Sequence, residues 1–413
     1  METVRVALMG GGTVGSAFAQ LLPAHRSRFR ALDVEVVLTR VLVRDTQKSR
    51  PGIPAGLLTD NPKGFLEGVD VLVEVAGGTT LAGDLVLQAL EMGLPVVTAN
   101  KALLAERWGE LREYAEEGSL YYEASVMAGT PILGALQSLW GNQTLEVHGI
   151  VNGTCSYLIR RMEEGATYDQ AFQEAEQLGY LEADPNLDVG GIDSAHKICV
   201  LGRLTVDPGL SWNKVLQRTR GIQHLTPELL QQARAEGYAI RLVASLYPDK
   251  DAWVAAVRPV RLPESHPLVS MGSGRNALVY KGDPVGQLVF AGAGAGGGVT
   301  ASAVLGDLIE IARHPKPPRY EDPSLRPGET APIESLTMRY CVRLVAPDED
   351  ALRALREPLR LLNAEFQPAE PLEAGIEQVA LTPPLNEGEF QAHVACMRER
   401  LGATVQVIRL LGG

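Results

Sequence analysis

The sequence begins with an apolar run, VRVALMG (residues 4–10), that leads directly into a glycine-rich turn. Such a run is typical of a strand buried on both faces of a sheet. The spacing Gly-x-Gly-x-x-Gly between a strand and a helix allows a tight turn and a close approach of the backbone to a pyrophosphate, which the helix N-terminus stabilises. The pattern predicts a dinucleotide-binding loop; a glycine-rich turn that binds nothing is the alternative. The candidate cofactor-binding residues of the loop are Gly10, Gly12, Thr13, Val14 and Gly15.

Strands and helices alternate after this turn. Apolar strands are expected at 34–45, 69–78 and 94–101, with a helical stretch at 81–92 between the last two. This alternation predicts an α/β domain with a parallel, doubly wound sheet of the Rossmann type over residues 1–130.

The pattern changes after this first domain. Helical and strand segments mix through residues 131–295, which predicts an α+β domain, and an amphipathic helix within 296–313 is expected to return to the first domain and complete it. Six prolines in residues 314–332 predict a semi-rigid, extended linker with few contacts. The βαββαβ pattern over residues 333–413 predicts a small ferredoxin-like domain.

Composition narrows the class of protein. The 413 residues are enough for two or three domains, and 45% of them are hydrophobic, as in globular proteins with real cores. Acidic residues outnumber basic ones by 50 to 38, a net charge of −12, which argues against a general binder of nucleic acids or anionic membranes. The four cysteines fit no metal spacing, and neither a leader nor a run of ~18 apolar residues is apparent. We therefore expect a soluble, cytoplasmic protein.

The end of the second strand bears on the choice of cofactor. NAD-preferring sites usually place an acidic residue there for the ribose 2′-hydroxyl. Here the strand ends in Arg44, followed by Asp45, with Lys48 and Arg50 close behind. A guanidinium offers a planar fork of donors that suits a 2′-phosphate. Arg44 therefore predicts NADP; Asp45 keeps NAD as an alternative, and an ordinary surface arginine is the structural alternative.

Two further polar residues follow expected strands. Lys101 comes just past the end of a strand, where ligands bind in open α/β sheets, so it is a candidate contact for substrate or cofactor or an ordinary exposed lysine. Glu123 precedes small residues in an expected loop, where a carboxylate and turned backbone carbonyls could hold a hard cation. A capping or turn role for Glu123 is the alternative.

Charged residues crowd the stretch EADPNLDVGGIDSAHK (182–197). Asp193 and Lys197 are i and i+4 of an expected helix and share a face. The apolar continuation ICVLGRL indicates that the helix is mostly buried, with its polar end facing a cleft. A lysine held near carboxylates in a cleft is a candidate acid–base group, and a surface ion pair is the alternative. We expect His196 to be structural and Asp188 to shape the loop.

These blocks together resemble the homoserine dehydrogenase family. GYLEADPNLDVGGIDSAHK resembles the signature region of the family, and TANKALLA, YEASVMAGTPI, NGTCSYLI and GAGAGGGVTASAVLGDL match in the same order across residues 1–313. The C-terminal βαββαβ unit resembles an ACT regulatory domain. The family interconverts L-homoserine and L-aspartate 4-semialdehyde with NAD or NADP, a step toward threonine, methionine and isoleucine. The resemblance implies that residues 131–295 carry the substrate site and the contacts of a homodimer or higher homo-oligomer.

The resemblance also implies roles for single residues. Lys197 is implied to donate and accept the proton at the reacting oxygen, with Lys101 and Asp193 in the same catalytic site. Glu182 and Asp193 would bind the amino group and hydroxyl of homoserine, and Lys101 would assist at both substrate and nicotinamide. The residues implied at the cofactor beyond the loop and Arg44 are Gly77, Lys101 and Gly296. The implied site for a monovalent cation, sodium or potassium, comprises Glu123 and the backbone carbonyls of Val126, Ala128 and Thr130.

The sequence leaves two alternative functions. The first is a phosphorylating aldehyde dehydrogenase with Cys155 of NGTCSY as nucleophile, but no histidine lies nearby in the sequence to activate the thiol. The second is a non-enzymatic sensor that binds NADP and uses the ACT-like domain as its output. The cluster of carboxylates and a lysine would have no function in either protein.

Overall fold

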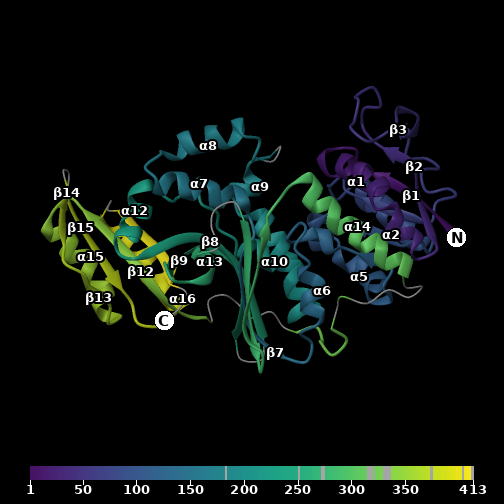
Figure 1. Cartoon of the computed structure of the whole chain (residues 1–413). Helices are drawn as coiled ribbons and strands as arrows, with labels where there is room; N and C mark the ends of the chain where they lie inside the picture. The colour runs from purple at the N-terminus through teal and green to yellow at the C-terminus, as the bar shows by residue number, and fades with distance from the viewer. Residues whose placement is uncertain are drawn as a thin grey trace.

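The structure, a computed structural model, describes residues 1–181, 184–249, 252–270, 275–313, 320, 322–328, 336–372, 375–401 and 404–410. Three units make up the molecule: an N-terminal unit (1–142 with 297–313), a central unit (143–293) and a C-terminal unit (336–410). Figure 1 shows the N-terminal and C-terminal units at opposite ends, with a long sheet between them. None of the described helices is long and apolar enough to cross a membrane.

The N-terminal unit contains a six-stranded parallel sheet, which confirms the predicted doubly wound sheet. Its strand order is β3-β2-β1-β4-β5-β6, and the order reverses between β1 and β4. Ligands bind at such a switch point, outside the C-terminal ends of the strands. The strands are β1 (Glu2–Met9), β2 (Val34–Leu42), β3 (Leu58–Thr59), β4 (Val71–Glu74), β5 (Val96–Thr98) and β6 (Leu120–Tyr121).

Helices cover both faces of this sheet because alternate residues of its strands point to opposite sides. Leu8 packs with Phe18 of α1 and Val304 of α14, whereas the next residue, Met9, packs with Leu85 of α3 on the other face. The return of α14 to α1 and the first sheet is visible in Figure 1. The helices of the unit are α1 (Thr13–Ala24), α2 (Arg26–Arg30), η1 (Ala55–Leu57), α3 (Leu81–Glu91), α4 (Lys101–Glu106), α5 (Trp108–Glu117), η2 (Glu123–Ser125), α6 (Ile132–Gln137) and α14 (Gly297–Arg313).

The central unit is a mostly antiparallel sheet, and its helix α10 lies against the N-terminal unit. Its strands run in the order β11-β10-β7-β8-β9, and α10 packs on β8, β9 and α4. The strands are β7 (Gln143–Ile150), β8 (Tyr238–Asp249), β9 (Ala252–Pro263), β10 (Arg275–Asp283) and β11 (Gly286–Ala293). The helices are α7 (Gly153–Glu163), α8 (Tyr168–Gln177), α9 (Asn186–Val189), α10 (Ile192–Thr205), α11 (Trp212–Gln217), α12 (Pro227–Ala235) and α13 (Pro267–Ser270).

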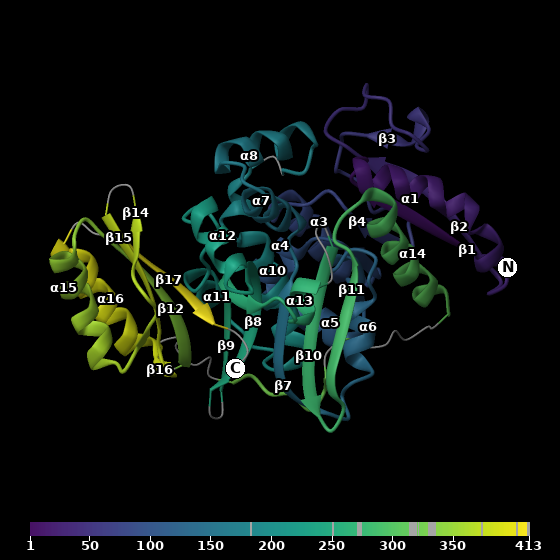
Figure 2. The same cartoon turned by 60° about the vertical axis from the view of Figure 1, so that its left-hand side comes forward.

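The C-terminal unit continues the central sheet. Its strand β17 pairs in parallel with β9, through Arg409 with Val260 and Leu410 with Arg261, and Figure 2 shows the two units meeting along this seam. Beyond the seam the order is β17-β12-β15-β13. The elements are β12 (Thr337–Ala346), α15 (Glu349–Leu361), β13 (Glu365–Phe366), β14 (Glu370–Leu372), β15 (Gly375–Leu381), β16 (Leu385–Asn386), α16 (Glu387–Leu401) and β17 (Thr404–Leu410).

The expectation of a linker with few contacts is wrong for the part of it that is described. The hydroxyl of Tyr320 donates to Asp307 of α14 at 2.8 Å, and the backbone N–H of Gly328 donates to Asp207 at 3.0 Å. Tyr320 is therefore held against the N-terminal unit and Gly328 against the central unit. The proline content of the linker predicted an extended chain. It carried no information about the carboxylates of Asp307 and Asp207, which accept hydrogen bonds from the linker.

Candidate active site

Helix α10 presents Asp193 and Lys197 one turn apart on a single face. Gly191, with a left-handed backbone (φ 79°), turns the chain into this helix. Every residue of α10 from Asp193 to Leu204 is buried, so the helix is a core element and its charged pair is removed from solvent. This burial excludes the alternative of a surface ion pair.

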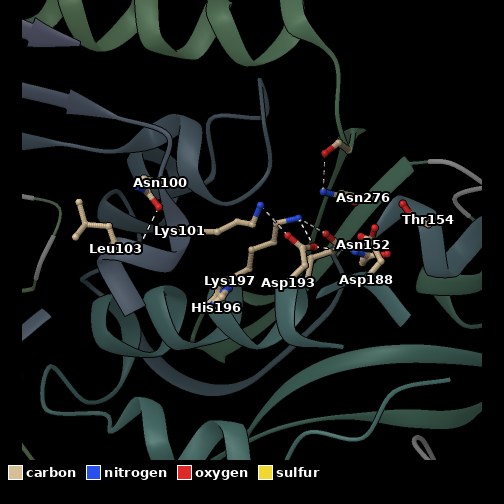
Figure 3. Close-up of polar contacts among 12 residues, drawn as sticks. Asn100, Lys101, Leu103, Asn152, Thr154, Asp188, Asp193, His196, Lys197 and Asn276 are labelled. Carbon is tan, nitrogen blue, oxygen red and sulfur yellow. Dashed lines mark hydrogen bonds and ion pairs between the residues drawn. The ribbon is translucent and has the colours of Figure 1, made fainter. Parts of the chain in front are cut away.

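Two lysine ammonium groups converge on the carboxylate of Asp193 (Figure 3). Lys197 Nζ donates to Asp193 Oδ2 at 2.8 Å and to the backbone carbonyl of Val151 at 2.6 Å. Lys101 Nζ lies 3.1 Å from the other oxygen, Oδ1. Burial alone would raise the pKa of Asp193, but the charges of Lys197 and Lys101 outweigh burial and hold that pKa well below its usual range. Asp193 is therefore an ionised anchor for two cations.

The position of Lys101 follows from the loop before it. Asn100 precedes α4 as its N-cap, and its side-chain oxygen accepts from the backbone N–H of Leu103 at 3.0 Å. Lys101 is thus the first residue of a helix at the C-terminal edge of the parallel sheet. Its side chain is 28% exposed, whereas that of Lys197 is 10% exposed, so Lys101 lies nearer the solvent side of the cluster.

Asn152 and Asp188 complete the cluster, and the sequence did not identify either as a site residue. Asn152 Nδ2 donates to Asp188 Oδ1 at 2.8 Å and to Asp193 Oδ2 at 2.9 Å. Asp188 is 2% exposed and lies in α9, so its role goes beyond shaping a loop. The spacing of 36 residues between Asn152 and Asp188 has no local signature. The only signal was that Asn152 precedes a helix, which is typical of a cap.

Cys155 and His196 lie near the cluster but face other partners. The thiol of Cys155 donates to the backbone carbonyl of Asp188, and burial, together with the charges of Asp188 and Asp193, raises its pKa well above the usual value. A thiol in this state is a poor nucleophile. His196 stacks on Trp212 and hydrogen-bonds Glu106 at 3.0 Å, pointing away from Lys197 in Figure 3.

The glycine-rich loop has the shape that a dinucleotide phosphate requires. Gly10 has φ 104°, and a Cβ there would lie 2.7 Å from the backbone nitrogen of Ala76. A Cβ on Gly15 would lie 2.0 Å from the carbonyl oxygen of Gly10, whereas one on Gly12 would meet nothing within 4 Å. Gly12 is the N-cap of α1 and supplies no side-chain cap, so the helix N-terminus is open to an anion. The residues present therefore fit a nicotinamide dinucleotide.

The other residues expected at the cofactor lie on three segments: the start of α14, the loop after β4 and the end of β2. The start of α14 closes on it, since a Cβ on Gly297 would lie 2.7 Å from the carbonyl oxygen of Thr13, and Gly296 (φ 132°) precedes it. Gly77 (φ 75°) lies in the loop after β4. Arg44 lies just beyond β2 and is exposed.

Glu123 uses its carboxylate to close a turn. Its two oxygens accept from the backbone N–H groups of Leu133 and Gly134 at 2.9 and 2.8 Å. The carboxylate therefore caps the N-terminus of α6. Burial raises the pKa of Glu123, and these hydrogen bonds partly offset the rise. The described residues contain no group of three His, Cys, Asp or Glu side chains suited to a metal ion. The predicted cation site, with one carboxylate and three backbone carbonyls, is not a group of that kind; its carbonyls lie on a turn where Ala128 has φ 51°.

Glu182, the other predicted ligand of the homoserine amino group, lies outside the described residues. The remaining predicted catalytic residues are brought together by the structure: Lys101 from the N-terminal unit, and Asp193 and Lys197 from the central unit. A buried ammonium group beside a carboxylate can donate a proton to a substrate oxygen as that oxygen gains charge, and can recover it in the reverse direction. The arrangement is suited to hydride-transfer chemistry that needs one proton.

Comparisons with known proteins agree over most of the chain. Residues 10–123 match the family model of the homoserine dehydrogenase NAD-binding domain, and residues 131–309 match that of homoserine dehydrogenase. A homoserine dehydrogenase of Mycobacterium leprae is 38% identical over 367 residues, which cover 84% of this chain and 81% of that protein. A solved homoserine dehydrogenase from Thiobacillus denitrificans has a TM-score of 0.88 at 30% identity, covering 100% of this chain and 99% of that one. A hyperthermophilic archaeal homoserine dehydrogenase in complex with NADPH has a TM-score of 0.62 at 28% identity, over 75% of this chain and 97% of that one.

Proposed function

The chain belongs to the homoserine dehydrogenase family, and we propose that the cluster of Asp193, Lys197 and Lys101 is the centre at which it interconverts L-homoserine and L-aspartate 4-semialdehyde. The reaction is an NAD(P)-dependent oxidation of an alcohol and its reverse. The observation that carries the assignment is the convergence of two ammonium groups on one buried carboxylate, beside the open edge of the parallel sheet. The nicotinamide, when bound, supplies or accepts the hydride.

We assign to Lys197 the transfer of the proton to and from the reacting oxygen. In the reducing direction its ammonium donates a proton to the aldehyde oxygen as that oxygen gains negative charge, and in the oxidising direction the neutral amine removes the proton of the hydroxyl. Asp193 and the Val151 carbonyl hold Nζ in place for this transfer. Lys101, on the more exposed side of Asp193, is assigned to the substrate and the nicotinamide site. Glu182 and Asp193 are assigned to the amino group and hydroxyl of homoserine.

For the cofactor, we propose NADP in preference to NAD. The loop residues Gly10, Gly12, Thr13, Val14 and Gly15 would hold the pyrophosphate, with Gly77 and Gly296 alongside. Arg44 is exposed at the end of β2 and would bind the 2′-phosphate. Arg44→Ala is expected to raise KM for NADP⁺ by about tenfold, the loss of one charge-assisted hydrogen bond, and to leave KM for NAD⁺ within about twofold. Arg28→Ala, at an exposed arginine of α2, is the control; equal changes for both cofactors would refute the role of Arg44.

We further propose that the turn before α6 holds a monovalent cation, sodium or potassium, through Glu123 and the backbone carbonyls of Val126, Ala128 and Thr130. No described residue donates a hydrogen bond to the carbonyls of Val126 and Ala128, which supports the proposal, whereas the carbonyl of Thr130 already accepts from the backbone N–H of Ile132 at 2.7 Å. Glu123 would keep the turn closed by capping α6. The melting temperature is expected to be higher in sodium or potassium chloride than in tetramethylammonium chloride at equal ionic strength. Identical melting temperatures would reject the site.

The C-terminal unit is proposed to be an ACT-like regulatory domain. Support comes from its βαββαβ order and from the strand order β17-β12-β15-β13, which places the fourth, first, third and second main strands side by side. We also propose that the protein assembles into a homodimer. The mass of the purified protein in sedimentation tests that assembly. The division into residues 1–130 with 296–313, 131–295, 314–332 and 333–413 is the domain scheme that we propose.

One assay tests the function as a whole. Reduction of NADP⁺ and of NAD⁺ by the purified protein is followed with and without L-homoserine. We expect reduction that depends on homoserine and is faster with NADP⁺ at low cofactor concentration. Reduction of NADP⁺ by the semialdehyde that requires inorganic phosphate would instead support the acyl-enzyme alternative at Cys155.

A further inference from the structure

Glu74 is a fully buried carboxyl group at the C-terminal end of β4, and the function assigned above gives it no role. It is in register with Met9, the last residue of β1, and with Thr98, the last residue of β5. It therefore lies beneath the edge at which the loops after these three strands meet. The contact between Gly10 and Ala76 confirms that the glycine-rich loop touches the loop after β4.

Three hydrogen-bond donors point at this carboxyl group. Oε1 accepts from the backbone N–H groups of Ala76 and Gly77, both at 2.9 Å, and Oε2 accepts from the hydroxyl of Thr98 at 2.7 Å. The Thr98 oxygen in turn accepts from the backbone N–H of Asn100 at 3.0 Å, which leaves its own proton for Glu74. Donors on both oxygens are the environment of an ionised carboxylate, which can only accept. Burial raises the pKa of Glu74, and these hydrogen bonds offset only part of that rise.

The same network sets the position of Lys101. Asn100 Nδ2 donates to the carbonyl of Gly78 at 2.7 Å, while Asn100 Oδ1 caps α4, the helix that begins at Lys101. Glu74 thus ties together the loop after β4 and the loop after β5. No basic side chain among the described residues forms an ion pair with Glu74. Hydrogen bonds rather than a paired cation therefore stabilise its ionised form.

The cofactor must pass these loops. Its pyrophosphate is assigned to the loop at residues 10–15, and its nicotinamide must reach the substrate at Asp193, because hydride moves directly between the two. The loops held by Glu74 connect these points: one touches Gly10 and the other carries Lys101, which contacts Asp193. The oxidised ring is positively charged and the reduced ring is neutral. A buried negative charge near the ring would therefore attract the oxidised cofactor and have little effect on the reduced one.

We propose that Glu74 is a positioning residue that holds both loops and whose charge favours binding of the oxidised cofactor over the reduced one. The proposal rests on the cofactor assignment above and adds a residue that acts through the loops rather than by touching substrate. At an effective dielectric constant of about 20, a unit charge changes binding about tenfold if it acts within about 12 Å of the ring. The effect is therefore large enough to measure.

The test compares the Kd values of NADP⁺ and NADPH by calorimetry in the full-length protein. Glu74→Gln keeps the size and the acceptor for Ala76 and Gly77 but removes the charge. We expect its Kd for NADP⁺ to rise about tenfold and its Kd for NADPH to stay within about twofold. Thr98→Val loosens the loops and keeps the charge, so it is expected to weaken both cofactors equally. Glu110→Gln, an exposed carboxylate of the same unit, controls for net charge and is expected to change neither.

Equal weakening of both cofactors by Glu74→Gln, or no change in either, would overturn the electrostatic role. If this variant does not fold, the ratio of the two Kd values is measured in Glu74→Asp, which retains the charge. A preserved ratio there supports the proposal, and a lost ratio shows that geometry rather than charge sets it. If the unmodified protein binds neither NADP⁺ nor NADPH, the cofactor assignment itself fails, which separates that result from a failure of this inference.

Discussion

Asn152 uses both ends of its carboxamide, which couples a helix cap to the active site. Its oxygen accepts from the N–H of Cys155 at 2.7 Å and caps α7, while its nitrogen bridges Asp188 and Asp193. Without the Asn152 side chain, the buried carboxylates of Asp188 and Asp193 would each lose a hydrogen-bond donor, and their mutual repulsion would be less well offset. We therefore expect substitution of Asn152 to affect both the helix cap and the active site.

Asn152→Ala is expected to lose about 1 kcal/mol of stability through the cap and also to raise KM for homoserine, because the carboxylates are no longer held apart. Asn152→Asp retains a capping oxygen but adds a third carboxylate, so it is expected to impair turnover more than stability. Denaturant unfolding and steady-state kinetics measure the two effects. Thr167→Ala removes the N-cap of α8 and serves as control, with loss of stability only. Normal kinetics in both Asn152 variants would contradict the bridging role.

At the scale of elements, the sequence predicted what a local pattern can encode. Continuous apolar runs identified β1, β2, β4 and β5, whereas β3 and β6, each two residues long, were missed. The i, i+4 spacing placed Asp193 and Lys197 on one face of α10. The hairpin of β10 and β11 was missed, because β11 is exposed or half-buried throughout and adjoins a glycine-rich segment. Contacts between elements, such as that of Asn152 with Asp188, depend on how helices pack and leave no trace in the sequence.

The start of α10 depends on one backbone conformation. Gly191 has φ 79°, and a Cβ there would lie 3.2 Å from Thr219 Cγ2 and 3.3 Å from Val257 Cγ1. Gly191→Ala is expected to destabilise the protein by about 1–2 kcal/mol and to lower turnover, because Asp193 follows two residues later. Gly306→Ala, on an exposed face of α14 where a Cβ meets nothing within 4 Å, is expected to be neutral or slightly stabilising. Thermal and chemical unfolding measure the stability of the two variants. Equal loss of stability in both would show that the backbone conformation of Gly191 is not required.

At the scale of the whole molecule, the C-terminal unit is an extension of the central sheet. Besides the pairing of β17 with β9, Leu336 packs on Val254 and Ala256, and Arg261 donates to the sulfur of Cys341 at 3.0 Å. Strand β9 also adjoins the start of α10, because Ala256 of the seam precedes Val257, which a Cβ on Gly191 would approach to 3.3 Å. None of these seam contacts involves Asp193, Lys197 or Lys101, so we expect them to contribute to stability rather than to the chemistry.

A chain that ends at Arg326 would expose Val254, Ala256 and the edge of β9. Loss of this apolar burial is expected to cost about 2 kcal/mol or more, or roughly 4–8 °C in melting temperature, and to promote association through the free edge. Homoserine oxidation is expected to persist in the fraction that remains folded. Scanning calorimetry and sedimentation check this expectation. A truncated chain with unchanged melting temperature and mass would show that the seam contributes nothing.

The central claim is that Lys197 moves the proton, and its turnover number tests that claim most directly. Lys197→Met fills the same buried space without an ammonium group, and Lys197→Ala serves as a second variant. Both are expected to lower kcat by about 10²–10⁴-fold, the usual contribution of a general acid–base group. Calorimetry is expected to give a Kd for NADPH within about twofold of the unmodified protein, because neither change touches the glycine-rich loop. Turnover within a few-fold of the unmodified protein would contradict the account, make Lys197 an ion-pair partner of Asp193 only, and leave Lys101 as the proton donor.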